Sequence, residues 1–177
     1  MSGHNKWSQI KHKKAKTDAA KSKIFGKFGK LITEEARKSN GDKNSPGLKS
    51  AIERAKASNM PNDSIERAIK KATEEKTALE SIAYEAYGPG GVAIIIEALT
   101  NNRNKAAQEV KHILSQNGIS LASPGSASWA FTKDPESHQM IAQTTVDLSE
   151  EDLNKLSILI DALEENDEVQ EVFTNAE

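Results

Sequence analysis

The sequence predicts an α+β protein, in which an N-terminal three-helix basic bundle is followed by an α+β sheet domain with two helices packed on the sheet. Apolar residues recur at helical spacing up to about residue 76, whereas from Ile82 they alternate as they do in strands. The glycine-rich turn Gly88–Gly91 then separates two strand-like runs, which indicates a hairpin. A chain of 177 residues is long enough for two small domains, which we place at residues 1–78 and 79–177.

The charges of the chain are divided in the same way. Residues 1–79 contain 19 lysines and arginines and 9 acidic residues, a net charge of +10. Residues 80–177 contain 5 lysines and arginines and 17 acidic residues, a net charge of −12. The overall charge of −2 therefore hides a basic half and an acidic half. This asymmetry suggests a module that faces nucleic acid, joined to one that does not.

The first long helix is predicted over residues 18–38, because apolar side chains recur there at helical spacing with lysines on the opposite side. Gly26 and Gly29 lie inside this helix, where each costs about 1 kcal/mol relative to alanine. We therefore expect close packing or a bend at these two glycines.

Two further helices complete the predicted bundle. Ser45 and Pro46 have the residue types of an N-cap and a first helical position, so a helix is expected from there to about Asn59. Asp63 and Glu66 have the spacing of a capping box, which predicts the start of a third helix ending near residue 76.

The remaining residues predict a sheet with two helices, an arrangement typical of α+β domains. One helix follows the polar loop 100–104 and ends at Asn117-Gly118. The other begins after the N-cap Ser149, with Asp152 at the capping-box position. The expected strands are 82–87, 92–99, 126–132, 140–146 and 169–173.

The N-terminal region is the strongest functional signal. Its first thirty residues contain nine lysines and one acidic residue, Asp18. Phosphate backbones are the usual partner of such charge, because their neutralisation releases condensed counterions, and aromatic rings can stack on bases. In the plainer alternatives the lysines form a solvated helix face and Trp7 is a packing anchor. The candidate nucleic-acid contacts are Lys6, Trp7, Lys11, His12, Lys13, Lys14, Lys16, Lys21, Lys23, Lys27 and Lys30.

A second polar cluster consists of Asn101, Asn102, Arg103 and Asn104. Asparagine and arginine side chains can bind bases, phosphates or the backbone of a partner protein, so this loop is a candidate contact for nucleic acid or a partner. Alternatively, Asn102 caps the following helix and Arg103 is exposed. The sequence favours neither interpretation over the other.

The sequence offers little for catalysis or metal binding. There is no cysteine, so neither a thiolate nucleophile nor a disulfide can form. The four histidines lack metal-ligand spacing, and Gly88–Gly91 is not followed by the Lys-Ser/Thr of a phosphate-binding loop. We therefore expect a protein that is not an enzyme and holds no metal or cofactor.

The sequence also lacks a membrane signal. The longest strongly apolar run, Val92–Ile96, is far too short to cross a bilayer. The N-terminus lacks the apolar core of a secretory signal. We expect a cytoplasmic monomer that does not bind membranes.

Four groups of residues form motifs that follow one another over nearly the whole chain. They are Gly3-His4-x-Lys6-Trp7 with Ile10–Ala15, Asp18 and Lys23–Phe25, then Asn59–Ile69, Tyr84–Ala93 and Thr100–Asn104. These groups resemble motifs of the YebC/PmpR family, in the family's order. The resemblance implies a cytoplasmic nucleic-acid-binding factor without enzymatic activity. Bacterial members are described as probable DNA-binding transcriptional regulators, some members have been assigned to ribosomes, and a mitochondrial relative activates translation.

The chain departs from the family pattern after Lys133. The family usually has three domains, the third of which is inserted after the strand that corresponds to residues 126–132. Only residues 134–139 span that point here, so we expect the inserted third domain to be missing. We predict that Ser81–Phe173 forms one compact domain in which Asp134–Gln139 is a plain surface loop.

Three functions follow from these observations. The first is a nucleic-acid-binding regulator of gene expression, a DNA-binding transcriptional regulator of the YebC/PmpR type. The second is a ribosome-associated translation factor that binds rRNA or tRNA and relieves stalls, which suits a lysine-rich surface because RNA is commonly read through its shape and backbone. The third is a protein-binding adaptor that uses the acidic C-terminal half.

Overall fold

The computed structural model describes residues 7, 17–75 and 77–177, which form two compact units. The helical unit comprises the described residues of Lys16–Leu79 together with Asp134–Gln139. The sheet unit comprises Glu80–Lys133, Met140–Glu177 and Trp7. Together they confirm the predicted α+β class, with a helical bundle preceding a sheet.

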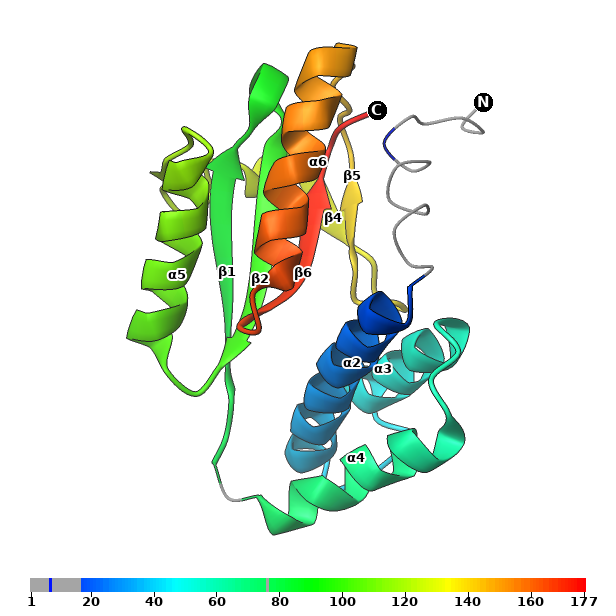
Figure 1. Cartoon of the computed structure of the whole chain (residues 1–177). Coiled ribbons are helices and arrows are strands. Elements are labelled where there is room, and N and C mark those ends of the chain that lie inside the picture. Colours follow the sequence, from blue (N-terminus) through cyan, green and yellow to red (C-terminus); the bar gives the residue numbers. More distant parts are fainter. Residues whose placement is uncertain (1–6, 8–16, 76) are drawn as a thin grey trace. The chain divides into compact units, whose positions relative to one another are not determined.

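The helical unit contains the three predicted helices, α2 (Asp18–Lys38), α3 (Pro46–Ala57) and α4 (Asn62–Glu74) (Figure 1). The bounds of α2 agree with the prediction, and the Thr17 hydroxyl caps it by accepting from the backbone N–H of Ala20 at 3.1 Å. The helices pack around one apolar core. Its buried members are Ile32, Ala36, Leu48, Ala51, Ala55, Met60, Ile65 and Ala68.

The capping box predicted for α4 is wrong. The helix begins earlier, with Pro61 as its N-cap, and the backbone N–H groups of Ser64 and Ile65 donate to the Pro61 carbonyl at 3.0 and 3.1 Å. Glu66 instead forms an ion pair with Lys43 at 2.7 Å. Proline suits this position because its φ, here −60°, is restricted in advance and because it lacks an N–H that would need a partner.

The expectation of close packing at Gly26 and Gly29 is also wrong. A Cβ built at either position would meet no atom within 4 Å, apart from the helix's own neighbouring backbone. The helix α2 runs through both residues. The two glycines therefore border open space.

The main sheet of the sheet unit has the strand order β3-β1-β2-β6, and each neighbouring pair is antiparallel. The predicted hairpin is confirmed, because β1 (Glu80–Tyr87) pairs with β2 (Ala93–Thr100) through the 3-10 turn η1 (Pro89–Gly91). Gly90 has φ +68°, which favours glycine. The outer strands are β3 (Leu121–Ala122), which the sequence did not predict, and β6 (Val169–Thr174).

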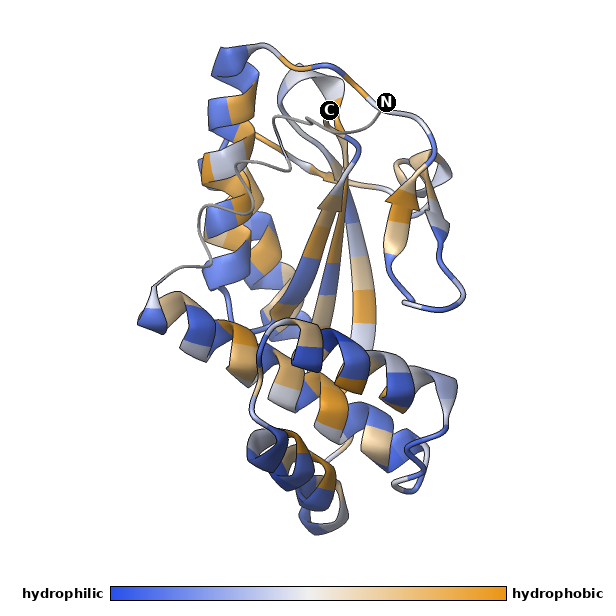
Figure 2. Ribbon diagram, turned by 90° about the vertical axis from the view of Figure 1, so that its right-hand side faces the viewer, coloured by the Kyte–Doolittle hydropathy of each residue, from blue (hydrophilic) through white to orange (hydrophobic). Residues whose placement is uncertain are grey.

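Two helices, α5 (Arg103–Gln116) and α6 (Glu150–Glu165), cover one face of this sheet (Figure 1). Apolar and hydrophilic residues alternate in bands along both the strands and the helices (Figure 2). Ile94 and Ile96 of β2 are fully buried together with Leu114 of α5 and Leu156 of α6. The predicted packing of two helices on the sheet is therefore confirmed.

The opposite face of the sheet is covered by the 3-10 turn η2 (Ser128–Ala130) and a two-stranded sheet of β4 (Phe131–Lys133) and β5 (Met140–Ala142). These strands are shorter than the predicted 126–132 and 140–146. The apolar cluster on this face consists of Ala93, Ile95, Ala127, Ala130, Phe131 and Phe173.

The prediction of one compact domain over Ser81–Phe173 is wrong in two respects. The strand β5 pairs with β4 outside the main sheet, and Asp134–Gln139 belongs to the helical unit. This turn is held by hydrogen bonds, because the Ser50 hydroxyl donates to the Ser137 carbonyl at 2.8 Å and the Asp134 carboxylate accepts from the Ser137 N–H at 2.9 Å. It is therefore not a plain surface loop.

Candidate nucleic-acid interface

The helix α2 positions four of the candidate lysines. Its apolar side chains, including Phe25, Phe28 and Leu31, pack against the core of the helical unit. Lys21 is exposed, and Lys23, Lys27 and Lys30 are partly exposed. The remaining cationic candidates lie outside the described residues. These are Lys6, Lys11, His12, Lys13, Lys14 and Lys16.

Trp7 is buried rather than presented to solvent. Its side chain is only 8% exposed and belongs to the main hydrophobic cluster of the sheet unit, which also contains Tyr84. A base cannot stack on a ring that the protein already covers. The burial of Trp7 therefore matches the packing alternative.

Several cations of the helical unit already have acidic or aromatic partners. Lys38 pairs with Glu35 at 3.0 Å, and Lys71 pairs with Glu75 at 2.9 Å. The guanidinium of Arg54 lies 5.8 Å from the centre of the Phe28 ring. Cations engaged in this way contribute less to binding a polyanion, because their charge is partly compensated.

Sequence reasoning overlooked two exposed lysines on α3. Lys49 and Lys56 are seven residues apart and therefore lie on one side of the helix. Neither forms an ion pair with another residue that the structure describes. Their spacing, on the side of α3 that flanks the apolar stripe containing Leu48 and Ala55, was the signal that could have identified them.

The helices α3 and α4 are joined by a short turn, but α4 is poorly suited to reading bases. In helix-turn-helix proteins the N-terminal residues of the second helix contact base edges. Here Asp63 lies in the first turn of α4 and Glu66 is exposed one turn later. Arg67 donates to the Asp63 carbonyl at 3.3 Å and to the Ser64 hydroxyl at 3.1 Å. The exposed carboxylates would repel phosphates.

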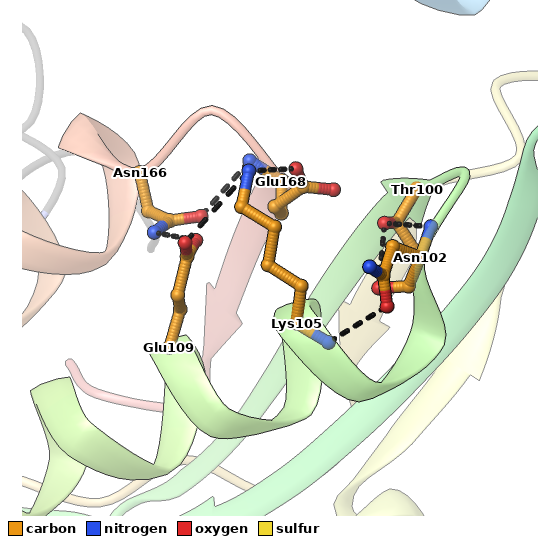
Figure 3. Close-up of polar contacts among 6 residues, drawn as sticks. All are labelled: Thr100, Asn102, Lys105, Glu109, Asn166 and Glu168. Carbon is orange, nitrogen blue, oxygen red and sulfur yellow. Dashed lines mark hydrogen bonds and ion pairs between the residues drawn. The ribbon is translucent and has the colours of Figure 1, made fainter.

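The polar loop after β2 caps a helix. The Asn102 side chain accepts from the backbone N–H of Lys105 at 3.1 Å, and the Asn102 N–H donates to the Thr100 hydroxyl at 2.9 Å (Figure 3). Arg103 is exposed and pairs with Glu80 at 2.6 Å. The structure thus shows the capping arrangement that the sequence left open. Asn101 and Asn104 are exposed beside it.

A polar network continues from this loop. Lys105 pairs with Glu168 at 3.0 Å and lies 3.8 Å from Glu109, which accepts a hydrogen bond from the Asn166 amide at 2.7 Å (Figure 3). The hydrogen bond to Glu168 raises the pKa of Lys105 above its ordinary value. The network connects α5 to the segment before β6, which is a structural role.

The described residues show no metal site and no membrane span. Across 17–75 and 77–177, together with Trp7, no group of three or more His, Asp or Glu side chains could hold a metal ion. In the same residues, no helix has the length and apolar character needed to cross a membrane.

Comparison with known proteins identifies the family. Residues 5–75 match the TACO1/YebC protein N-terminal domain. Residues 79–136 and 132–176 match the TACO1/YebC second and third domain. The chain belongs to the TACO1/YebC family. Lys6 and the lysine cluster that follows it lie within the matched N-terminal domain.

Relatives in this family are longer or align with gaps. A protein of Halothermothrix orenii is 46% identical over 167 residues, which cover 93% of this chain and 63% of the relative. A protein of Thermoanaerobacter pseudethanolicus is 39% identical over 239 positions, covering 100% of this chain and 97% of the relative. Both are named probable transcriptional regulatory proteins. This chain therefore spans just under two thirds of the length of the Halothermothrix orenii protein.

The fold also occurs in a solved structure. A conserved hypothetical protein of Aquifex aeolicus superposes with a TM-score of 0.79 at 31% identity, covering 97% of this chain and 96% of that chain.

The extra positions of the relatives bear on the prediction that the inserted third domain is missing. The second alignment has 239 positions against 177 residues here, so at least 62 of its positions have no counterpart in this chain. The two segments that match the second and third domain meet at residues 132–136, where β4 ends.

Proposed function

We propose that this TACO1/YebC protein is a cytoplasmic, monomeric regulator of gene expression that binds the phosphate backbone of nucleic acid through residues 1–38. The observation that carries the proposal is the excess of nine lysines over one acidic residue in the first thirty positions. The protein acts by binding, without a catalytic step. Duplex DNA is the first target that we propose, in agreement with the names of its relatives as probable transcriptional regulatory proteins.

The helical unit supports binding of the backbone rather than reading of bases. Lysine side chains supply affinity for phosphates but little base specificity. The carboxylates of Asp63 and Glu66 occupy the part of α4 that would have to enter a groove. We therefore propose that the sequence of the DNA affects binding only weakly.

The same observation favours structured RNA as a second candidate target. Proteins bind RNA helices mostly through shape, phosphates and 2′-hydroxyl groups, so an interface without base-reading side chains suits RNA as well as DNA. In this alternative the protein is a translation factor that works on the ribosome.

Charge reversal in the N-terminal region tests the proposal. Lys13→Glu with Lys14→Glu should weaken binding to a duplex of random sequence and reduce the salt dependence of the affinity by about two phosphate contacts. The matched control is Arg103→Glu with Lys155→Glu, which changes the net charge equally within the sheet unit at two cations that already pair with carboxylates. Equal losses in the two variants would show a general charge effect and would contradict the proposed site.

A second experiment separates the two targets. The affinities for a DNA duplex and an RNA duplex of the same sequence are compared, and cell extracts are tested for co-sedimentation with polysomes. Tighter binding to DNA without polysome association supports transcription regulation. Tighter binding to RNA with polysome association would replace that proposal by the ribosomal alternative.

A further inference from the structure

Trp129 in η2 is an exposed aromatic ring in a fixed position. Its side chain is 63% exposed. The indole N–H donates to the Tyr87 hydroxyl at 2.9 Å, and that hydroxyl donates in turn to the Ser126 carbonyl. The N–H edge of the ring is therefore occupied, while most of the side chain remains open to solvent.

The backbone that carries Trp129 is held by a buried carboxylate. Glu85 accepts hydrogen bonds from the backbone N–H groups of Gly125 and Ala127 at 2.7 Å and of Ser128 at 2.9 Å. Charge-assisted hydrogen bonds of this kind are about twice as strong as neutral ones. Since Glu85 and Tyr87 both lie on β1, one strand fixes the backbone before Trp129 and the orientation of its ring.

The chain around Trp129 is compatible with a polyanion. No acidic residue occurs from Val110 to Lys133, although residues 80–177 as a whole carry a net charge of −12. The charged side chains of this stretch are the cations Lys111 and Lys133. The negative charge nearest to this backbone is that of Glu85, which is buried and already accepts three backbone hydrogen bonds, so a phosphate backbone that approached Trp129 would meet less repulsion than elsewhere in the acidic half.

The surroundings of Trp129 favour a nucleobase over a protein partner. A stable protein interface buries about 800 Å² on each partner around an apolar centre. Here the residues before Trp129 include three serines, Ser123, Ser126 and Ser128. Trp129 is more exposed than the neighbouring Tyr87, 63% against 39%. An open aromatic ring beside small polar residues suits one planar ring, because every base has a π-face that can stack on it.

We propose that Trp129 stacks on an unpaired nucleobase of the nucleic acid that the N-terminal lysines bind. The inference rests on the proposed function, because stacking adds to an affinity that the phosphate contacts supply. Tyr87 acts as a positioning residue that sets the orientation of the indole. Stacking on Trp129 adds affinity for nucleic acid that carries unpaired bases, whether the strand is DNA or RNA, and adds none for a fully paired duplex.

Tryptophan fluorescence tests this inference directly. The chain has two tryptophans, so Trp7→Phe leaves Trp129 as the only one. Oligo(dT), oligo(U) and a DNA duplex are added to this variant while labelled strands report binding by anisotropy. Stacking should quench the emission with the single strands and leave it nearly unchanged with the duplex, and the two single strands distinguish DNA from RNA.

Substitutions then measure the contribution of the ring. Trp129→Ala should weaken single-strand binding by about 5-fold to about 100-fold, and Trp129→Phe should retain most of the affinity. Duplex affinity should not change. The matched control is Ile158→Ala, which removes an equally exposed apolar side chain from α6 and should leave both affinities unchanged.

The outcomes distinguish this inference from the proposed function. If labelled strands bind but the emission of the Trp7→Phe variant is not quenched and Trp129→Ala leaves the affinity unchanged, the stacking site is wrong and the proposed function stands. If no nucleic acid binds, both fail. If sedimentation shows a dimer that Trp129→Ala dissociates, Trp129 belongs to a protein interface and the inference is overturned.

Discussion

Glu85 is the residue whose environment differs most from what its position in the sequence suggests. It is a carboxylate in the middle of a strand, yet it is only 9% exposed and accepts three backbone hydrogen bonds. Burial alone would raise the pKa of Glu85, but the N–H groups of Gly125, Ala127 and Ser128 hold this pKa below its ordinary value. Their hydrogen bonds favour the charged form.

This pKa shift predicts a pH dependence of stability. Because the pKa is lower in the folded than in the unfolded protein, Glu85 stabilises the fold above the unfolded value, about 4.3. The stabilisation is lost as the pH falls through the folded pKa. Glu85→Gln should lower the free energy of unfolding by about 2 kcal/mol at pH 7 and remove part of the acid-induced loss. Urea denaturation at pH 7 and below pH 4 measures both effects, and identical pH profiles of the two proteins would contradict this account.

Substitution by alanine should destabilise the protein to very different extents at Trp7 and at Trp129. Trp7→Ala removes a buried ring and should lower the free energy of unfolding by about 3 kcal/mol or more. Trp129→Ala removes an exposed ring and should cost about 0.5 kcal/mol or less. Thermal melting of both variants measures the difference. Equal destabilisation would contradict either the burial of Trp7 or the exposure of Trp129.

The sequence could not distinguish these two tryptophans. From residue type and sequence neighbours alone, Trp7 is a candidate base contact, with packing as the alternative. Trp129 falls within the strand expected over 126–132. What decides their exposure is the arrangement of residues far away in the chain. Tyr87, which binds the Trp129 indole, precedes it by 42 positions.

At the scale of elements, local patterns predicted the helices and the hairpin. The apolar spacing of residues 18–38 and the turn Gly88–Gly91 act over a few neighbouring positions, and both predictions are confirmed. The strand predicted over 126–132 failed for a long-range reason. Glu85 takes the N–H groups of Ala127 and Ser128 that a strand would donate to its neighbour, so the chain forms η2 before β4 begins.

The candidate site was predictable to a similar extent. The density of positive charge can be counted from the sequence without knowledge of the fold, and it identified the lysines of α2. The role of Asn102 stayed open, since an asparagine amide can cap a helix or bind a ligand with the same atoms. Lys49 and Lys56 were overlooked because they are separated by acidic and apolar residues in the sequence and become neighbours only on the helix surface.

The glycines of α2 give a prediction at the element scale. Since a Cβ at Gly26 or Gly29 has open space around it, Gly26→Ala with Gly29→Ala should raise the free energy of unfolding by about 2 kcal/mol, which is about 1 kcal/mol for each position. Thermal melting measures this change. A matched control is Gly118→Ala at the end of α5, which should destabilise because the φ of Gly118 is +71°. A loss of stability in the double α2 variant would show that the glycines are required for packing.

The glycine variant is informative about binding as well. Glycine allows the backbone to approach a ligand closely. If phosphates contact the backbone of α2, the double variant should be more stable but bind nucleic acid more weakly. An unchanged affinity would restrict the contact to the lysine side chains.

At the scale of the whole molecule, the chain passes between its two units four times, first between Trp7 and the start of α2. It leaves the helical unit after Leu79, enters it again at Asp134 and returns to the sheet unit at Met140. The sequence located this short connection but not the unit to which it belongs. The hydrogen bond from the Ser50 hydroxyl to the Ser137 carbonyl spans 87 positions, which no local pattern predicts.

The whole-molecule charge distribution supports the central claim that the N-terminal region binds nucleic acid through its phosphates. Residues 1–79 carry a net charge of +10, while residues 80–177 carry −12. Binding that depends on the positive charge of residues 1–79 should be strongly sensitive to salt, because each phosphate contact releases a counterion.

The most direct test is the affinity of the full chain for a random-sequence DNA duplex, measured over a series of salt concentrations. If about five phosphates are neutralised, the logarithm of the binding constant should fall with the logarithm of the salt concentration with a slope of about −4. The Lys13→Glu, Lys14→Glu variant should give a shallower slope. An affinity that does not change with salt would contradict electrostatic binding by the N-terminal lysines.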